Sequence, residues 1–468
     1  MIAVFFLIFH FLYLALLAYA VHEIIFKQRW ILLIVFLILF LPTYLSFQSV
    51  IYNFTESPVI SVFWRVVKEL LILLVIGMMV VTSRNNLKTL PRLAPTDWVY
   101  GMLLGLTFIF FVLPIGPATF ANKLLYVRSI VLPASMYFIG RNMTLTRQDQ
   151  NILIIALCTM IALTFTVNFF EFSSGIHFQK LIGWMKYNSD ILESEPQGYY
   201  GLGWNFERGP NSPRFGAFYG NSLEAGASAI LLFATSLFLL WYSRHVSNKI
   251  IFAIALLMCV FTNYLAFSRA ALVGLFSTLF IAAVFFRYYR LILLAFGIVI
   301  LSAIGVIYFA DEVLRNYVID TLTFRQASSL GHLLEWIQAF DEMLTNPFGI
   351  GLATSGNAAG VESDLKVGGE SQVLTFGVQM GFLGVALYVS LIISVLRVCY
   401  KTFQRATSAE EKFIPFVTAL TKFGLLLPIV TTLAENFLFL SYVSWWMAGC
   451  TVAMSVRQQE QGNSWNMA

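Results

Sequence analysis

The chain has 468 residues, of which 59% are hydrophobic and only 11% charged, with a formal net charge of +5. Soluble domains carry roughly 25% charged residues, so this composition excludes an ordinary soluble enzyme. The apolar residues occur in runs of about 17 or more, long enough for helices that cross a bilayer. Backbone polar groups in lipid must be paired internally, and no alternating barrel pattern is visible. We therefore predict an all-α fold, a polytopic transmembrane helical bundle.

Thirteen apolar segments follow one another along the chain. The first contains Ala18-Tyr19-Ala20, which resembles a signal-peptidase site. A basic leading region is missing and the apolar run is long, so we expect a retained first span. The predicted spans lie near residues 2–20, 30–48, 59–82, 98–114, 124–140, 151–170, 221–243, 249–267, 270–286, 291–309, 372–396, 413–433 and 436–455.

Lysine and arginine are concentrated in alternate connections between these spans. An excess of these residues marks the cytoplasmic side of a membrane protein. Every basic connection falls on that side if the N-terminus is outside and the C-terminus inside. Two long segments, 171–220 and 311–370, then lie on the outer side, and loops of this length in a compact protein are usually functional. The first of them is rich in aromatic residues and glycine, which suits stacking on sugar rings or an interfacial belt.

Within the second outer segment, residues 332–344 predict an amphipathic helix. Asn346-Pro347 ends this helix, because proline disfavours helical geometry in the preceding residue. Such a helix would lie along the outer membrane–water boundary, as a structural cap or as a moving lid. Its apolar stripe is Leu333, Ile337, Phe340 and Leu344, opposed to the polar residues His332, Glu335, Asp341 and Glu342.

Arginines and carboxylates are the candidates for chemistry on the outer side. The sequence has no metal-ligand cluster, nucleophile elbow or nucleotide-binding fingerprint, and its four cysteines form no CxxC pair. Arg208 and Arg214 precede the seventh span, and Arg269 lies at the turn after the eighth. An arginine beside a membrane span often marks a functional site, and its guanidinium binds phosphate oxygens bidentately without a metal. Together they suggest a site for pyrophosphate or another anion; snorkelling of Arg269 and solvation of the other two are the alternatives.

Glu370 is the leading candidate for a catalytic base. It follows two glycines and precedes the eleventh span, at or near a helix N-cap. The helix dipole would favour its ionised form, although an acidic residue there also simply complements that dipole. Other charged residues near outer span ends rank lower: Arg65, Lys68, Lys123, Arg128, Glu224 and Glu435.

The segment Glu370-Ser371, nine residues, Gly381, two residues, Gly384 resembles the signature of the O-antigen ligase and polymerase superfamily. In the ligases the signature is His, then Asn, Ser or Gln, nine residues, Gly, two residues, then Gly, Thr or Tyr. The resemblance extends to NPFGIGL, to SRAALVGL and to the arginine-bearing outer loop, so it covers more than the C-terminal half of the chain.

The resemblance implies a metal-independent, inverting glycosyltransferase of the C-type membrane fold (GT-C), without a cofactor. Such enzymes use undecaprenyl-pyrophosphate-linked glycans at the periplasmic face of the bacterial inner membrane. Family ligases activate the acceptor with the signature histidine and hold the donor pyrophosphate with outer arginines. By this resemblance Glu370 is the base, Arg214 and Arg269 contact the pyrophosphate, and Arg208 is a candidate third contact.

Because Glu370 stands where the ligases have histidine, we expect a polymerase that joins repeat units into O-antigen of lipopolysaccharide, capsule or exopolysaccharide. Glu370 would take the proton of an acceptor hydroxyl in a single displacement, while the arginines stabilise the departing lipid pyrophosphate. His332 and Glu335 would bind sugar or orient Glu370, with a structural role as the alternative.

The expected organisation follows from this assignment. The parts are N-terminal spans (1–170), a periplasmic loop (171–220), central spans (221–310), a periplasmic catalytic loop (311–370), and C-terminal spans with a short cytoplasmic tail (371–468).

Expected partners are lipid-linked glycan donor and acceptor, membrane lipids, and chain-length regulator and flippase proteins, without nucleic acid. A ligase that transfers glycan to a lipid A core or a protein is the first alternative. A transporter of anions or lipid-linked sugars is more distant, because no inverted repeat is evident.

Overall fold

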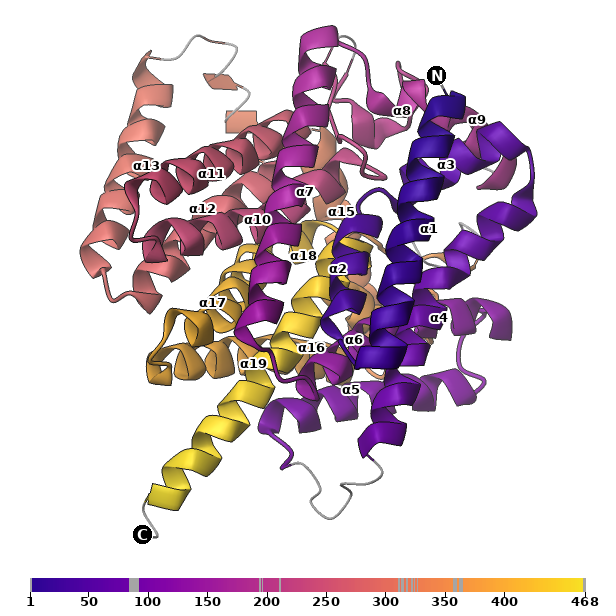
Figure 1. Ribbon diagram of the computed structural model, residues 1–468. Helices are drawn as coiled ribbons and strands as arrows, with labels where there is room; N and C mark the ends of the chain where they lie inside the picture. The colour runs from indigo at the N-terminus through magenta and orange to yellow at the C-terminus, as the bar shows by residue number, and fades with distance from the viewer. Residues whose placement is uncertain are drawn as a thin grey trace.

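The computed structural model describes residues 2–83, 92–192, 195, 197–209, 212–309, 312, 315–316, 319–320, 323, 325, 327–356, 360–361 and 365–465. Over these residues the fold is helical, with one isolated bridge between Glu207 and Pro213 (Figure 1). The α-helices are α1 (Ile2–Lys27), α2 (Ile31–Phe40), α3 (Tyr44–Thr55), α4 (Pro58–Ser83), α5 (Pro95–Val112), α6 (Phe120–Arg141), α7 (Arg147–Ser174), α8 (Phe178–Leu181), α9 (Trp184–Ile191), α10 (Ser222–Tyr242), α11 (Val246–Ala266), α12 (Arg269–Phe285), α13 (Tyr289–Phe309), α15 (Ala327–Thr345), α16 (Gln372–Arg405), α17 (Ala409–Gly424), α18 (Leu426–Thr431) and α19 (Leu438–Trp465).

The prediction of a polytopic helical membrane protein is confirmed at the level of fold class. A helix lies at each predicted span, and among the described residues eight helices are long and apolar enough to cross a membrane. The span predicted at 30–48 is not one straight helix, because α2 and α3 meet at an angle of 63°. Pro42 lies in the turn between them, and proline lacks the amide hydrogen that a continuous helix requires. The count of thirteen spans stays a prediction.

Helix α10 forms the centre of one half of the bundle. It packs against α7, α11, α12 and α17 (Figure 1), and most of its side chains are buried. In the other half α6 and α19 approach each other closely. A side chain at Gly140 would meet the carbonyl oxygen of Trp446 at 2.1 Å, and one at Gly449 would meet that of Tyr137 at 2.1 Å. Small residues thus let these two helices pack backbone against backbone, as in many membrane bundles.

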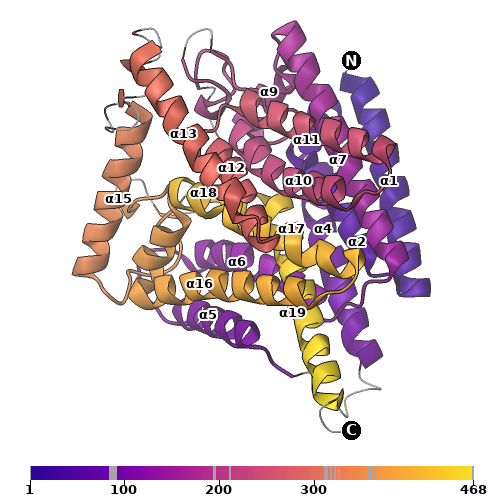
Figure 2. The same ribbon diagram turned by 90° about the vertical axis from the view of Figure 1, so that its left-hand side faces the viewer.

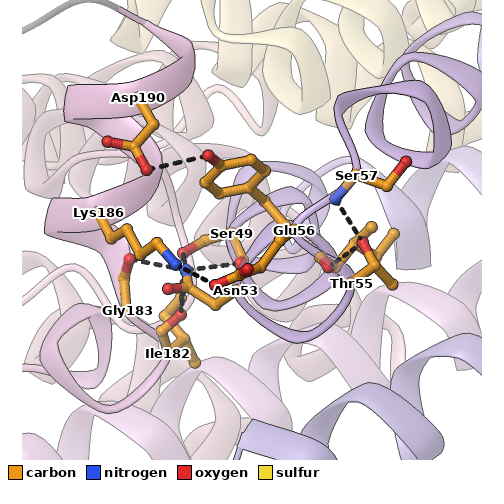
Figure 3. Close-up of polar contacts among 11 residues, drawn as sticks. Ser49, Asn53, Thr55, Glu56, Ser57, Ile182, Gly183, Lys186 and Asp190 are labelled. Atoms are coloured by element: carbon orange, nitrogen blue, oxygen red, sulfur yellow. Dashed lines mark hydrogen bonds and ion pairs between the residues drawn. The ribbon is translucent and has the colours of Figure 1, made fainter.

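The segment 171–220, predicted as the first outer loop, is attached to the end of α3. The side-chain amide of Asn53 donates hydrogen bonds to the carbonyl oxygens of Ser49 (2.8 Å) and Gly183 (2.9 Å). Beside them, Nζ of Lys186 lies 2.6 Å from a carboxylate oxygen of Glu56 (Figure 3). Helix α9 is therefore fixed against α3, which sets the position of the arginine-bearing part of the loop.

The base of the same loop is closed by two buried polar side chains. The carboxylate of Glu171 accepts hydrogen bonds from the amides of Phe178 (2.9 Å) and Ala217 (2.8 Å). The side-chain amide of Gln179 donates to the carbonyl oxygens of Ala217 (2.7 Å) and Tyr219 (3.0 Å). Buried backbone groups need such partners, so these bonds hold the irregular chain in one conformation.

The predicted helix at 332–344 is confirmed as α15, which lies at one edge of the bundle beside α16 (Figure 2). It packs on α16 through Ala339 and Met343, which form a small buried cluster with Val378. Most of the predicted apolar stripe lies open instead of being covered by the bundle, although Leu333 is half-buried. Its members Ile337 and Phe340 are 56% and 51% exposed. This face is available to lipid or to a ligand.

Candidate functional site

Helix α16 is interrupted in the middle of the signature segment. Gly381 has φ 70° and ψ −170°, which lies outside the helical region. The chain around Pro347 fills the break. The amide of Phe382 donates to the carbonyl oxygen of Pro347 (3.1 Å), and the amide of Ile350 donates to that of Val378 (2.9 Å). Irregular backbone within a membrane protein requires such internal partners.

Glycine is required on both sides of this contact. A side chain at Gly381 would meet the carbonyl oxygen of Pro347 at 2.2 Å, and one at Gly349 would meet that of Gln379 at 2.5 Å. Gln379 adds a bond, because its side-chain oxygen accepts from the amide of Ala353 (2.8 Å). The NPFGIGL element and the glycine of the signature are therefore two halves of one structural unit.

Glu370 lies at the start of α16, one residue before its N-cap. The N-cap is Ser371, whose Oγ accepts a hydrogen bond from the amide of Leu374 (3.4 Å). The carboxylate of Glu370 is 43% exposed, and its Oε2 contacts Nδ1 of His332 on α15. The two residues come from separate elements, so their contact joins α15 to the mouth of α16.

Glu335 lies on the same side of α15, close to Glu370. The backbone amide of Glu370 donates a hydrogen bond to the Glu335 carboxylate. Burial raises the pKa of Glu335 above its ordinary value, and the negative charge of Glu370 raises it further. The predicted residues Glu370, His332 and Glu335 therefore form one cluster, in which Glu335 holds its proton more readily than a free glutamate.

Arg269 connects the arginine side of the site to α15. It is the first residue of α12, and the preceding Ser268 caps that helix by accepting from the amide of Ala271 (3.3 Å). The guanidinium NH1 of Arg269 donates to Oγ of Ser329 (3.2 Å). Ser329 lies about one helical turn before His332, so Arg269 and the carboxylate cluster share α15 as a common support.

Arg208 and Arg214 lie in a tight segment of the first outer loop. The amide of Arg214 donates to the carbonyl oxygen of Phe206 (2.8 Å), and the guanidinium of Arg208 lies 5.2 Å from the ring centre of Phe267. Phe267 ends α11 and lies two residues before Arg269. The amide of Phe215, next to Arg214, donates to the carbonyl oxygen of Leu265 in α11 (3.0 Å), so the backbone of all three predicted arginines lies near the turn between α11 and α12.

The aromatic residues of this loop divide into two groups. Trp184, Tyr187 and Phe206 are buried in a small hydrophobic cluster that holds the loop together. Tyr199 and Trp204 are 66% and 62% exposed. Only the exposed group is free to stack on a sugar ring, so the composition reflects both packing and available surface.

A buried ion pair lies deeper in the bundle, and Lys422 was not singled out from the sequence. Its Nζ lies 3.0 Å from Oε1 of Glu435 and 3.7 Å from the ring centre of Trp445. The Glu435 carboxylate also accepts from Nε1 of Trp445 (2.7 Å) and lines a cavity of about 40 Å³ that reaches Gln372 and Thr375 at the start of α16. Lys422 could have been recognised from the sequence, because it lies in the apolar run ALTKFGLLLP. Charged residues within spans are usually functional or paired.

An apolar groove of about 480 Å³ opens between α15 and the start of α16. It begins at Trp336, about one turn beyond His332, and its floor includes Ser371, the residue after Glu370. The remaining lining residues are Ile337, Phe340, Asp341, Leu344, Val373, Leu374 and Val430. The groove therefore places an apolar surface directly beside the carboxylate cluster.

The fold and these positions define a multi-pass helical membrane protein with a carboxylate–histidine pair and arginines beside it. Over the described chain, no group of three or more His, Cys, Asp or Glu residues could hold a metal ion. Residues 253–389 match the family model described as O-antigen ligase, which confirms the resemblance predicted from the sequence. No curated protein matches the chain.

The family match covers part of the candidate site. It includes Arg269, His332 and Glu370, whereas Arg208 and Arg214 lie before its first residue. Members of this family are bacterial, membrane-bound and glycosyltransferase-like. The match thus supports an O-antigen ligase- or polymerase-like function. It covers fewer residues than the segment in which the sequence resembles the superfamily.

Proposed function

We propose that this protein is an inverting glycosyltransferase that polymerises undecaprenyl-pyrophosphate-linked repeat units at the periplasmic face of the inner membrane. The contact between His332 and Glu370 is the observation that carries the proposal. Glu370 occupies the signature position of a glycosyltransferase-like family. The imidazole of His332 would orient its carboxylate. The resulting polymer would be O-antigen, capsule or exopolysaccharide.

In the proposed reaction Glu370 is the general base. Its Oε2 faces His332, which leaves the other oxygen to accept a proton from an acceptor-sugar hydroxyl. The deprotonated oxygen attacks the anomeric carbon of the donor, and a new glycosidic bond forms. The bond between that carbon and the pyrophosphate oxygen breaks, and its electron pair leaves with the lipid pyrophosphate. One displacement inverts the anomeric configuration.

The arginines and the groove would hold the lipid-linked substrate. Arg214 and Arg269, with Arg208 as a third contact, would bind the pyrophosphate, because guanidinium groups pair with phosphate oxygens in bidentate geometry. The apolar groove between α15 and α16 would accommodate part of a polyisoprenyl chain. This reaction needs no metal or cofactor, since arginines supply the positive charge at the leaving group.

A ligase remains the second candidate, and the description of the matching family favours it. The two functions differ in the glycan that accumulates when the gene is deleted from its host. Loss of a polymerase leaves single repeat units, whereas loss of a ligase leaves long chains attached to the carrier lipid. Long lipid-linked chains in the deletion strain would replace the polymerase proposal with the ligase.

A further inference from the structure

A second cluster of charged side chains lies outside the candidate site, on α4 and α6. Lys68 lies 3.5 Å from a carboxylate oxygen of Glu69, and Arg128 pairs with the same oxygen. Nζ of Lys68 donates to the backbone carbonyl oxygen of Arg65 (2.7 Å), and the guanidinium of Arg65 is close enough for its charge to act on Lys68. The cluster therefore contains three cationic side chains and one carboxylate, which leaves an excess of two positive charges.

Tyrosine side chains hold this cluster in place. NH2 of Arg65 donates to the hydroxyl of Tyr187 (2.9 Å), and Nζ of Lys68 lies 4.3 Å from the ring centre of Tyr44. Lys68 is only 2% exposed, whereas the side chain of Arg128 is 44% exposed. The cluster therefore combines a buried lysine with an arginine that is open to the surroundings.

Two acidic groups at the contact between α3 and α9 already have partners. Glu56 pairs with Lys186 (2.6 Å), and Asp190 accepts from the hydroxyl of Tyr52 (2.9 Å). These groups lie on exposed surface where α9 meets the end of α3, so solvent screens their charges. Among the described residues, the excess positive charge of the α4–α6 cluster is thus not matched by these carboxylates.

The depth of the cluster identifies the kind of anion that would match it. Lys68 lies ten residues into α4, or roughly 15 Å along the helix axis from its predicted outer end. In the span predicted at 59–82, unbalanced cations would lie beside hydrocarbon at a high cost, so a bound anion would stabilise this arrangement. At such a depth an anion on an amphiphile is favoured over a free ion, because its apolar part remains in lipid.

We propose that Arg65, Lys68 and Arg128 form a second anion site, which binds the phosphate group of a lipid. Two sources carry this chemistry, the carrier lipid pyrophosphate and an ordinary membrane phospholipid. If the proposed function holds, the site would bind the pyrophosphate of the acceptor while Arg214 and Arg269 bind that of the donor. A polymerase requires two such sites, because both of its substrates are linked to lipid pyrophosphate.

The test is lipid binding to purified, delipidated protein, followed by native mass spectrometry. The probes are undecaprenyl pyrophosphate and phosphatidylglycerol, with undecaprenol and diacylglycerol as neutral counterparts. We expect Arg65→Gln/Arg128→Gln to weaken binding of phosphate lipids at least tenfold, because charge-assisted hydrogen bonds are lost. The matched control is Arg147→Gln, which removes an 80% exposed arginine elsewhere and should bind like the wild type.

A thermal measurement keeps the proposal testable if the double variant folds poorly. Lys68→Met removes one unbalanced cation, so the delipidated variant should melt above the wild type. Phosphate lipids should raise the Tm of the wild type and not that of the variant.

The two phosphate lipids also distinguish the two sources. Tighter binding of undecaprenyl pyrophosphate than of phosphatidylglycerol would identify the carrier lipid, whereas equal binding of the two would identify a structural phospholipid. Equal binding of neutral lipids, or wild-type binding by the double variant, would overturn the site.

The role in polymerisation has its own readout. In a Glu370→Gln background, two undecaprenyl pyrophosphates should bind per chain, and only one after Arg65→Gln/Arg128→Gln is added. If Glu370→Gln still shows turnover, the proposed role of Glu370 is wrong. The number of bound lipids is measured separately and still tests the second site. One bound pyrophosphate lipid in both proteins would contradict the acceptor assignment.

Discussion

Oε2 of Glu370 contacts Nδ1 of His332, although 37 residues separate them and only His332 lies in a helix, α15. The ligase signature has histidine at the position of Glu370. Here an imidazole occupies the adjacent space, supplied by α15 instead. Of the roles expected for His332, this contact favours the orientation of Glu370, and we propose His332 as the positioning residue for the proposed base.

We expect Glu370→Gln to lower turnover about 10²–10⁴-fold, because it keeps the shape of the side chain but removes its proton affinity. Glu370→His should recover part of the activity that glutamine loses. The measurement is turnover of purified enzyme on lipid-linked repeat units, with donor affinity determined in parallel. Glu342→Gln is the control on α15, since the Glu342 carboxylate accepts a hydrogen bond from the side chain of nearby Asn346. Wild-type turnover of Glu370→Gln would reduce the residue to a helix-terminal charge.

Arg269→Ala should reduce turnover by about 10²–10³-fold, since it removes a donor to the developing pyrophosphate charge. Arg269→Lys should stay clearly below the wild type, because lysine retains the charge but not the planar fork. The control is Arg287→Ala just beyond the other end of α12, where the guanidinium bonds to Gln404. Kinetics at varied donor concentration would show both effects, and normal kinetics of Arg269→Ala would place the pyrophosphate elsewhere.

Gly381→Ala should destabilise the protein by more than about 3 kcal/mol. A left-handed φ costs about 1–2 kcal/mol for alanine, and the added carbon would also collide with the Pro347 carbonyl. Gly77→Ala is the matched control, because a side chain there meets nothing within 4 Å. Thermal unfolding in detergent compares them. Equal Tm values for the two variants would mean that the break in α16 is not needed.

The first outer loop should lose stability in mild acid because of His177. This residue is 1% exposed and packs against the rings of Tyr200 and Phe215. Burial, followed by the charge of Lys180, lowers its pKa to about 4. A lowered pKa means that the unfolded chain binds the proton first, so stability is complete above about pH 6.5 and falls as the pH drops toward 4.

The loss attributable to His177 should reach about 3 kcal/mol near pH 4. His177→Phe fits the aromatic surroundings and should remove this part of the pH dependence. Hydrogen exchange of the loop at pH 7.5 and pH 5 would measure the effect. The exposed His22, replaced by Gln, serves as the control. An unchanged pH profile in His177→Phe would show that another group titrates.

Lys422→Met should cost about 3–5 kcal/mol, because Glu435 would remain charged, buried and without its cation. Lys422→Met/Glu435→Gln should be less destabilised than the single variant, because glutamine still accepts from Nε1 of Trp445. Unfolding of the two variants in detergent tests this difference. If the double variant is the less stable one, the pair contributes net attraction that exceeds its desolvation.

The sequence alone determined the class of protein and the main candidates for chemistry. Long apolar runs have few structural solutions in a membrane, so hydropathy was sufficient to predict the helical bundle. The helix at 332–344 followed from its periodicity and from the proline that ends it. The spacing from Glu370 to Gly381 was sufficient to indicate the family, because a motif of fixed spacing is a property of the chain itself.

Only the tertiary structure decided which of these residues meet. The contact of His332 with Glu370, the bond from Arg269 to Ser329 and the pairing of Lys422 with Glu435 all join separate elements. Periodicity identifies the faces of a helix, but not the neighbour that each face receives. For the same reason the apolar stripe of α15 could be recognised from sequence, whereas its open position beside the start of α16 could not. Packing of small residues such as Ala339 against α16 made that choice.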